Sequence, residues 1–596
     1  MTLAIKSSFF LHFSWLINKI LYIYYSKPLK EMTGTQLFTS IRSLIEKEDY
    51  DELQKLKVYK PEYFNWVRDV FEPYNVNVLG DQLGLIWKYN TKEEKYTYRE
   101  LAAKSNQFLN FLRLHNIQQG AIMFSQVPLL PCSWISYLAC IKGGLIVIPA
   151  AVTLETRDLK FRFESAFPDV ALADPSNADK IDAAEALLDR KIKLKIITEG
   201  EREGWVSIHE IDKCSTEAEA ANTKPDDNLF YFFTSGTTGM PKVVVHTHYT
   251  YPLGSFTTSS WVGMRQGDLH YNISQPGWAK FFWSSFFAPW NMGATILGFH
   301  SDRFVAKDQL KALEDYKVTT FCAPPTALRS LILEDLNLYK FNLRQCVAAG
   351  EPLNPEIIEV WKQATGITIR DGYGQTETTA SIVNLPHEKV KFGSMGKPTF
   401  LYDVVIADDE GNEVSYHEEG NICIRFDEST VNGVFKTYLI QLDKMKKVFK
   451  HGLYYTGDKA YKDEEGYVWF VGRDDDVIKA SDFRVGPFEV ESVLLEHDSI
   501  VETAVVASPH PTRSNAVKAF IILGEGIEPT KELAEEIFVF SEAHLARYKI
   551  PRIIQFVETL PKTISGKIRR VELRANEAMA KQNKSEIPHE YYHAKY

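Results

Sequence analysis

The stretch Tyr231–His248 reads YFFTSGTTGMPKVVVHTH, and the rest of the chain is organised around it. The apolar run at residues 229–233 precedes six residues that are only Thr, Ser and Gly. A β-branched run at residues 243–245 follows directly after Lys242. Short apolar runs on either side of a glycine-rich segment predict two strands joined as a hairpin with a polar tip.

The tip of this hairpin has the composition of a phosphate-binding loop. Glycines let backbone N–H groups turn toward an anion, hydroxyls add donors, and a lysine adds positive charge. The residues concerned are Thr234, Ser235, Gly236, Thr237, Thr238, Gly239 and Lys242. The same residue types are ordinary turn formers, so a flexible hairpin loop is the alternative. A Walker loop fits poorly, because Lys242 does not follow a glycine and no helix-forming stretch comes next.

Size and charge narrow the function classes. A chain of 596 residues is too long for one hydrophobic core, so at least two domains are expected. A net charge of -10 and the lack of a long basic run argue against a nucleic-acid partner. The expected substrate is therefore a small molecule.

The cysteines and histidines give no metal-binding pattern. The six cysteines are scattered without ligand spacing, which favours buried thiols in a reducing compartment, the cytoplasm or an organelle matrix. His246 and His248 alternate on a strand and so share one face, for which structural or polar roles are favoured over metal ligation.

The N-terminal stretch at residues 9–25 is aromatic and aliphatic but is interrupted by polar residues. It makes a poor membrane span, and no cleavage site of small residues follows it. The interpretations left open are a weak membrane anchor, an interfacial helix, or an extension upstream of a start at Met32.

From Thr97 to Ile197 short apolar strands alternate with amphipathic helices, one of them at residues 98–114. This alternation predicts an α/β fold with a mainly parallel sheet, whose site lies at the strand ends. Two later strands break into glycine and polar residues, at 347–355 and 371–378. The aromatic stretch 268–290 is expected to be mainly core, with some side chains lining a cleft.

Beyond Ser394 short strands and Gly or Asp turns predict an all-β subdomain or small barrel. A compact α+β pattern resumes at Ser481 and includes a helix at residues 532–548. The polar segment from Ala578 is expected to be loosely held.

Six motifs occur in one order: TSGTTGMPK, AAGEP, DGYGQTE, YYTGD, GRDDDVI and PKTISGK. Together they resemble the adenylate-forming acyl-CoA synthetases, most closely the medium-chain branch, over roughly Tyr98 to Arg570. The resemblance implies a large AMP-binding domain of α/β subdomains plus a small β-barrel, followed by a mobile α+β domain. The implied division is 1–34 as an extension, 35–474 as the large domain, 475–577 as the small domain and 578–596 as a polar tail.

The resemblance also implies the reaction. ATP and a carboxylic acid would give an acyl-adenylate and pyrophosphate, with Mg²⁺ as cofactor, and coenzyme A would then displace AMP. Because two anions must meet, positive charge and hydrogen-bond donors are needed around the α-phosphate.

Site residues carried over from the resemblance fall into three groups. The hairpin tip, Thr234 to Lys242, would hold the β- and γ-phosphates, and Glu377 would bind Mg²⁺. The adenine, ribose and α-phosphate would contact Gly350, Glu351, Pro352, Asp371, Gly372, Tyr373, Gly374, Gln375, Thr376, Asp458 and Arg473. Lys567 would bridge the carboxylate and the α-phosphate, so Lys242, Thr376, Glu377 and Lys567 are the implied catalytic residues.

The small domain would rotate about Asp475 between the two half-reactions. One orientation would deliver Lys567, and the other Ser481, Asp482, Phe483 and Arg484 for coenzyme A, with Arg513 near its nucleotide. This sequence has Asp482 where relatives carry glycine, and Ser514 after Arg513 where they carry glycine. Two alternatives therefore stay open: an adenylating enzyme with a carrier-protein thiol or another acceptor, and a catalytically impaired nucleotide-binding or membrane-scaffold protein.

Gly374 bears on the acid. Acetate-activating relatives place a tryptophan at the matching position, so glycine would leave the acyl pocket open. Trp278, with Phe281, Phe282 and Trp283, would line it, which predicts a medium-chain or aromatic acid rather than acetate.

Overall fold

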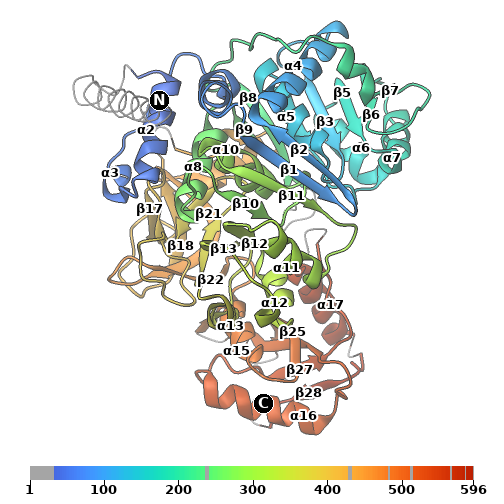
Figure 1. Ribbon diagram of the computed structural model, residues 1–596. Coiled ribbons are helices and arrows are strands. Elements are labelled where there is room, and N and C mark those ends of the chain that lie inside the picture. The colour runs from blue at the N-terminus through green and yellow to red at the C-terminus, as the bar shows by residue number, and fades with distance from the viewer. Residues whose placement is uncertain are drawn as a thin grey trace.

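The computed structural model describes residues 32–234, 241–426, 432–480, 483–510, 514–563, 567–583 and 585–594. Figure 1 shows two large sheets with their helices in the upper part of the molecule, and a smaller domain below them. None of the helices in these ranges is long and apolar enough to cross a bilayer. The stretch at residues 9–25 lies outside the described residues.

The first large sheet contains the predicted hairpin. Within the described residues it has eight strands, in the order β19 (Thr437–Tyr438), β9 (Lys242–Thr247), β8 (Asn228–Thr234), β4 (Ile146–Pro149), β3 (Ile122–Gln126), β5 (Val170–Ala173), β6 (Leu194–Ile197) and β7 (Val206–Ser207). β8 and β9 pair antiparallel, and the strands from β8 to β7 pair parallel. The hairpin and the parallel α/β sheet are thus confirmed.

The second large sheet joins distant parts of the chain. Its nine strands among the described residues are, in order, β16 (Lys397–Pro398), β15 (Ala380–Val383), β14 (Ile369–Gly374), β13 (Gln345–Ala349), β12 (Thr320–Ala323), β10 (Leu269–Asn272), β11 (Thr295–His300), β1 (Leu83–Tyr89) and β2 (Lys92–Thr97). β1 pairs in parallel with β11, and Leu85 lies opposite Ile296.

Helices cover both large sheets. Those of the first part of the chain are α2 (Gly34–Glu46), α3 (Tyr50–Gln54), η2 (Val67–Val76), α4 (Tyr98–Leu114), α5 (Pro131–Gly143), α6 (Thr156–Ser165), α7 (Pro175–Ala186) and η3 (Ile208–Lys213). Those of the second sheet are α9 (Ala279–Phe282), η4 (Trp283–Phe287), α10 (Ala288–Asn291), α11 (Ala306–Asp315), α12 (Pro325–Ile332), η5 (Leu336–Leu338) and α13 (Pro355–Thr365). The predicted helix 98–114 is present, and Thr97 and Glu100 form its capping box.

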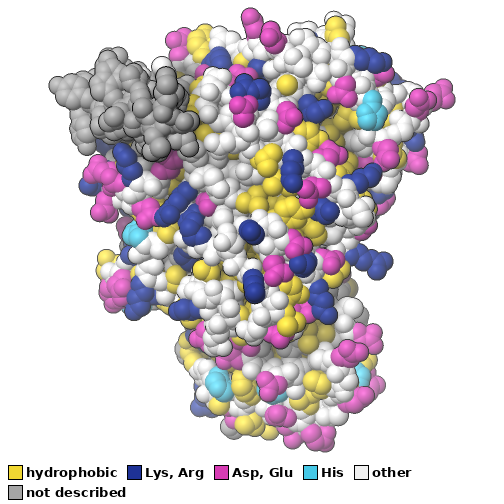
Figure 2. All heavy atoms as spheres, viewed as in Figure 1, with side chains coloured by type: hydrophobic (Ala, Val, Ile, Leu, Met, Phe, Trp, Pro, Cys, Tyr) yellow, Lys and Arg dark blue, Asp and Glu magenta, His cyan; other side chains and the backbone are white. Residues whose placement is uncertain are grey.

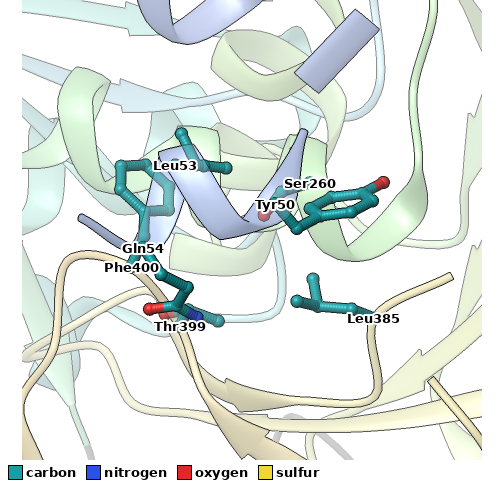
Figure 3. A pocket seen from close by; sticks show the side chains of 7 residues that line it. All are labelled: Tyr50, Leu53, Gln54, Ser260, Leu385, Thr399 and Phe400. Atoms are coloured by element: carbon teal, nitrogen blue, oxygen red, sulfur yellow. The ribbon is translucent and has the colours of Figure 1, made fainter. Parts of the chain in front are cut away.

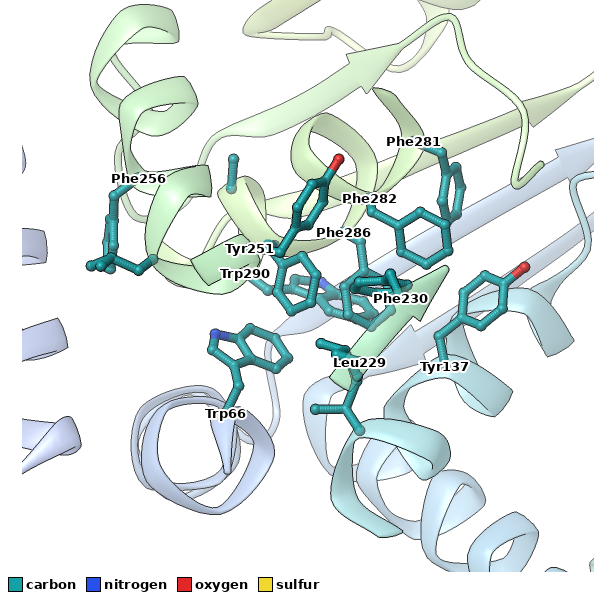
Figure 4. Close-up of a cluster of buried hydrophobic side chains, with 14 of the residues drawn as sticks. Trp66, Tyr137, Leu229, Phe230, Tyr251, Phe256, Phe281, Phe282, Phe286 and Trp290 are labelled. Carbon is teal, nitrogen blue, oxygen red and sulfur yellow. The ribbon is translucent and has the colours of Figure 1, made fainter. Parts of the chain in front are cut away.

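Helix α8 (Thr250–Val262) lies between the two large sheets and is buried along its whole length. Four of its hydroxyls, those of Ser255, Thr257, Ser259 and Ser260, bond to carbonyls of the preceding turn, for example Ser255 Oγ to Tyr251 O (2.8 Å). Thr258 Oγ1 is buried without a partner among the described residues. Aromatic side chains fill the space beside it: Phe230 of β8 packs on Phe282 with ring centroids 4.5 Å apart (Figure 4). The aromatic stretch 268–290 is therefore mainly core.

The predicted small barrel is a five-stranded antiparallel sheet of β17 (Val404–Ala407), β18 (Gly420–Arg425), β20 (Phe449–Lys450), β21 (Leu453–Lys462) and β22 (Val468–Arg473), with α14 (Leu442–Val448) beside it. Among the described residues no strand pairing closes this sheet into a barrel.

The small domain has its own sheet and core. Its strands are β23 (Ile478–Ala480), β24 (Phe483–Val485), β25 (Ile500–His510), β26 (Ser514–Leu523), β27 (Ile553–Phe556) and β28 (Glu590–Tyr592). Its helices are α15 (Pro487–Leu494), α16 (Lys531–His544) and α17 (Arg570–Gln582).

The prediction of a loosely held tail from Ala578 is wrong. Helix α17 runs on to Gln582, and β28 pairs antiparallel with β27. Glu590 of β28 lies 2.5 Å from Lys518 Nζ, which is fully buried and also pairs with Glu577. A buried ammonium needs such partners, and this need holds the polar segment in place.

Candidate active site

The predicted site residues of the large domain gather where β13 and β14 end. Gly350, Glu351 and Pro352 follow β13, and Asp371–Gly374 form the end of β14 next to it. The carboxyl ends of adjacent parallel strands meet at one edge of a sheet, which brings the two motifs together. Gly350 has a φ of 113°, a conformation that favours glycine.

Asp458 of β21, the predicted ribose ligand, lies at the centre of a hydrogen-bond network. Its Oδ2 accepts hydrogen bonds from Tyr373 Oη (2.5 Å) and Gln375 Nε2 (2.7 Å). Tyr454 Oη donates in turn to Gln375 Oε1 (3.0 Å), which fixes the amide. Asp458 is only 7% exposed, and Arg473 lies opposite it in the β21–β22 pairing.

Burial raises the pKa of Asp458, although the charges of Arg473 and Lys567 and the bonds from Tyr373 and Gln375 oppose the shift. The electrostatic effect of Lys567 on Asp458 is informative, because that lysine belongs to the small domain. The structure therefore brings the predicted catalytic lysine and the predicted ribose carboxylate into one site.

Lys567 is joined to Thr563 of the small domain by two hydrogen bonds. Thr563 N donates to Lys567 O (2.7 Å), and Lys567 N donates to Thr563 Oγ1 (3.1 Å). The residue stays exposed to solvent, yet enough protein surrounds it that burial lowers the pKa of its ammonium. Arg473 and Lys280 lower this pKa further, and Glu351 and Asp458 oppose the shift.

Glu377, the predicted magnesium ligand, is 9% exposed. Its Oε1 accepts a hydrogen bond from Tyr438 Oη (2.9 Å), and Lys242 Nζ lies 5.2 Å from the ring centroid of the same tyrosine. Within the described residues, Glu377 Oε2 has no hydrogen-bond partner. One accessible carboxylate oxygen fits Mg²⁺, which binds through one or two carboxylates and the phosphates of its substrate.

Among the described residues, no group of three or more His, Cys, Asp and Glu side chains could hold a metal ion by itself. His246 and His248 are both fully buried. His246 instead donates from Nε2 to the carbonyl of Thr376 (2.7 Å), and burial lowers its pKa to about 3, so the ring is neutral.

Glu351 and Asp371 are predicted to lie beside the adenine, and both accept hydrogen bonds from backbone N–H groups. Glu351 Oε1 accepts from the backbone N of Thr326 in the first turn of α12 (2.8 Å), a favourable place for a carboxylate. Asp371 accepts from Gly372 N (2.9 Å), and burial raises its pKa to about 8.

Several predicted site residues lie outside the described residues: Ser235, Gly236, Thr237, Thr238 and Gly239 of the hairpin tip, and Ser481, Asp482 and Arg513 for coenzyme A. The side chain of Phe483 also lies outside them. Asp475 is exposed in the turn between β22 and β23, beside the ion pair of Asp476 with Arg574 of the small domain.

Only some of the residues predicted to line the acyl pocket are accessible. Phe281 and Phe282 are fully buried in the core, whereas Trp278 and Trp283 stay partly accessible. At Gly374 a Cβ would lie 1.9 Å from the carbonyl oxygen of Thr379, so the turn into β15 requires glycine whatever the size of the pocket.

Two hollows elsewhere do not match the site. A cavity of about 10 Å³ between Tyr50, Leu53 and Leu385 has room for about one water at most (Figure 3). An open hollow of about 510 Å³ lies along β7, at the edge of the first sheet opposite the hairpin. In Figure 2 acidic and basic side chains intermingle on the visible face.

Sequence reasoning missed Tyr438. It stands in no motif, and only the pairing of β19 with β9, which sets Tyr438 opposite Val244, brings it to Lys242 and Glu377. A short aromatic strand after a glycine is too weak a signal to assign to the edge of a particular sheet.

The sequence profile of the AMP-binding enzymes matches residues 75–439, and that of the AMP-binding enzyme C-terminal domain matches residues 489–567. The chain is 49% identical over 534 residues to 4-hydroxybutyrate–CoA ligase 1 of Metallosphaera sedula, covering 89% of this chain and 93% of the relative. It is 39% identical over 535 residues to the mitochondrial acyl-coenzyme A synthetase ACSM3 of Mus musculus, covering 88% of this chain and 92% of the relative.

Solved structures agree. The anthranilate CoA ligase AuaEII in complex with anthranoyl-AMP superposes with a TM-score of 0.81 at 30% identity, covering 89% of this chain and 99% of the ligase. The benzoate CoA ligase of Burkholderia xenovorans LB400 gives a TM-score of 0.76 at 25% identity, covering 86% and 100%. Because the family profile matches more than half of the chain and these relatives match most of its length and its fold, the chain belongs to the AMP-binding enzyme family and is an acyl-CoA synthetase that uses ATP, Mg²⁺ and coenzyme A.

Proposed function

We propose that this synthetase activates a carboxylic acid longer than acetate, of the medium-chain fatty or aromatic class, and that the residues described above carry out its adenylation. The observation that carries the residue assignment is the position of Lys567. The small domain places this lysine within electrostatic reach of Asp458, Arg473 and Glu351, all of the large domain.

In the first half-reaction a carboxylate oxygen attacks the α-phosphorus of ATP, and the bond from that phosphorus to the pyrophosphate oxygen breaks. The charges of Lys242 and Lys567 offset the repulsion between the two anions. Glu377 would hold Mg²⁺, which supplies positive charge to the phosphates. The hairpin tip, Thr234 to Gly239, would contact the β- and γ-phosphates through N–H and hydroxyl donors.

The ribose assignment follows from the bonding of Asp458. Tyr373 and Gln375 hold the carboxylate at Oδ2, and a carboxylate held in one orientation suits two adjacent ribose hydroxyls. The ring of Tyr373 is oriented by the same hydrogen bond and would stack on the adenine, with Gly350–Pro352 beside it.

In the second half-reaction the thiol of coenzyme A attacks the acyl carbonyl carbon, and the bond from that carbon to the AMP oxygen breaks. Rotation about Asp475 would withdraw Lys567 and deliver the segment that contains Ser481, Asp482 and Phe483. The position of Asp475, exposed in the turn between β22 and β23, supports a hinge there.

Two features support the acid class. Trp278 and Trp283 give a partly accessible aromatic surface on the large domain. Structural relatives are named for anthranilate and benzoate, and one sequence relative is named for 4-hydroxybutyrate. Aromatic rings favour apolar acyl groups that are larger than the methyl group of acetate.

The test is a panel of acetate, hexanoate, benzoate and 4-hydroxybutyrate, with AMP release measured with and without coenzyme A. Hexanoate or benzoate should give the highest kcat/KM, and AMP release should depend on coenzyme A. Equal or better turnover of acetate would refute the acid class. Turnover of 4-hydroxybutyrate above all others would move the assignment to hydroxy acids.

The working compartment is proposed to be the cytoplasm or an organelle matrix. All six cysteines are unpaired, which suits a reducing compartment, and ACSM3 of Mus musculus is named mitochondrial. Association with a membrane through residues 9–25 stays a prediction.

A further inference from the structure

Tyr438 links the lysine beside the phosphate loop to the carboxylate assigned to Mg²⁺. Its hydroxyl donates to Glu377 Oε1 (2.9 Å), and its ring lies 5.2 Å from Lys242 Nζ. The residue is 1% exposed, and a tyrosine hydroxyl next to a carboxylate oxygen acts as the donor.

The backbone makes this link rigid. Tyr438 lies on β19, which pairs with β9 directly after the hairpin tip. Three residues earlier, Phe435 N donates to the backbone carbonyl of Glu377 (2.8 Å). The segment 435–438 therefore holds Glu377 at both its main chain and its side chain, and Tyr438 of the same segment also contacts Lys242.

A carboxylate bound at one oxygen presents the other in a fixed direction. Within the described residues, Glu377 Oε1 accepts the hydrogen bond from Tyr438, and Glu377 Oε2 has no hydrogen-bond partner. A metal ligand that is oriented before binding loses less conformational entropy, and outer partners of this kind strengthen metal binding.

We propose that Tyr438 is a positioning residue for adenylation, which orients Glu377 toward Mg²⁺ and holds Lys242 over its ring face. This inference rests on the assignment of Glu377 in the proposed function. Because the hydroxyl of Tyr438 bonds to Glu377 and its ring faces Lys242, it would act through these two residues.

The experiment compares Tyr438→Phe, Tyr438→Leu and Glu377→Gln in the full-length enzyme. The readouts are the half-saturating free Mg²⁺ in ATP–pyrophosphate exchange, the KM for ATP, and the rate of thioester formation from supplied acyl-adenylate. Tyr438→Phe should raise the Mg²⁺ requirement roughly tenfold, since it removes a hydrogen bond to a charged group. Tyr438→Leu should also raise the KM for ATP, by about two- to fivefold, because the cation–π contact with Lys242 is lost.

Thioester formation should be unchanged in both tyrosine variants, because this half-reaction involves no triphosphate. Tyr249→Phe is the matched control: it removes another buried tyrosine hydroxyl, bonded to Tyr59 O (2.9 Å) away from the site. The double variant Tyr438→Phe/Glu377→Gln should need no more Mg²⁺ than Glu377→Gln, since the two act as a unit.

The outcomes distinguish an error in the role of Tyr438 from an error in the assignment of Glu377. A normal Mg²⁺ requirement in Tyr438→Phe beside a raised one in Glu377→Gln overturns the role of Tyr438 alone. A normal requirement in Glu377→Gln overturns the assignment of Glu377, and with it this part of the proposed function. Equal loss of both half-reactions in Tyr438→Phe makes the residue merely structural and overturns the inference.

Discussion

At the scale of single residues, Lys567 should separate the two half-reactions. We expect Lys567→Ala to lose adenylation by about a thousandfold or more, because a charge at the reacting phosphate is removed. Thioester formation from supplied acyl-adenylate should remain. ATP–pyrophosphate exchange and single-turnover thioester formation measure the two rates separately.

Lys562→Ala is the control for this experiment. Lys562 is near Lys567 in the sequence but pairs with Glu502 inside the small domain (2.9 Å). Its loss should leave both half-reactions near wild type. If Lys567→Ala lowers both rates equally, the lysine is not specific to adenylation.

Asp371 should make stability depend on pH. Its pKa is raised from 3.8 to about 8 by burial, so between these values the folded chain binds a proton that the unfolded chain has lost. The contribution is fully present below about pH 4 and is lost as the pH rises toward 8. Asp371→Asn should therefore gain stability relative to wild type as the pH rises, by up to about 1.4 kcal/mol per pH unit.

Denaturant unfolding at pH 5, 6.5 and 8 measures this difference. The exposed Asp189→Asn serves as control and should track wild type. A constant difference between Asp371→Asn and wild type at all three values would mean that Asp371 is ionised in the folded enzyme.

At the scale of elements, Gly374 tests why glycine ends β14. Gly374→Ala should cost about 1–3 kcal/mol of stability, since its Cβ would meet the backbone carbonyl of Thr379. The displaced strand end should also weaken adenylation, because Tyr373 precedes it. Thermal unfolding and ATP–pyrophosphate exchange measure both effects.

Gly524→Ala is the matched control, since the nearest atom to its Cβ would be the flexible Ile527 Cδ1 at 3.2 Å. The alternative outcome is equally informative. If Gly374→Ala keeps its stability but shifts preference from hexanoate toward acetate, the glycine acts through the size of the acyl pocket instead.

The elements also show what the sequence can predict. The β8–β9 hairpin and α4 follow from local patterns, a glycine-rich break between apolar runs and a capping box at Thr97. The contact between Tyr438 and Glu377 could not be predicted, because it depends on β19 pairing with a strand roughly 200 residues earlier. The tail from Ala578 looked loose because its polar residues pair with a buried lysine, a partner that local composition does not reveal.

At the scale of the whole molecule, the network around Lys518 should stabilise the small domain. Glu590→Gln removes one of two carboxylates from a fully buried ammonium, which should cost about 3 kcal/mol or more. Hydrogen exchange in β26 and β27 should increase, and both half-reactions should fall, because the small domain serves each.

The exposed Glu586→Gln is the control, on the same segment but away from Lys518. Unchanged exchange in Glu590→Gln would mean that β28 contributes little and that the segment is loosely held after all.

The strand order of the second large sheet has a consequence for synthesis in the cell. β1 and β2 are synthesised early, but the parallel partner of β1 is β11. Leu85 therefore cannot pair in the sheet until Ile296 has been synthesised. At about 5–20 residues per second, the roughly 200 intervening residues take about 10–40 s to translate. During that time the edge of the β1–β2 hairpin that later pairs with β11 is unpaired, and unpaired strand edges aggregate. We therefore expect the yield of folded enzyme to depend on early binding by chaperones and to be higher in cells that grow slowly at a low temperature.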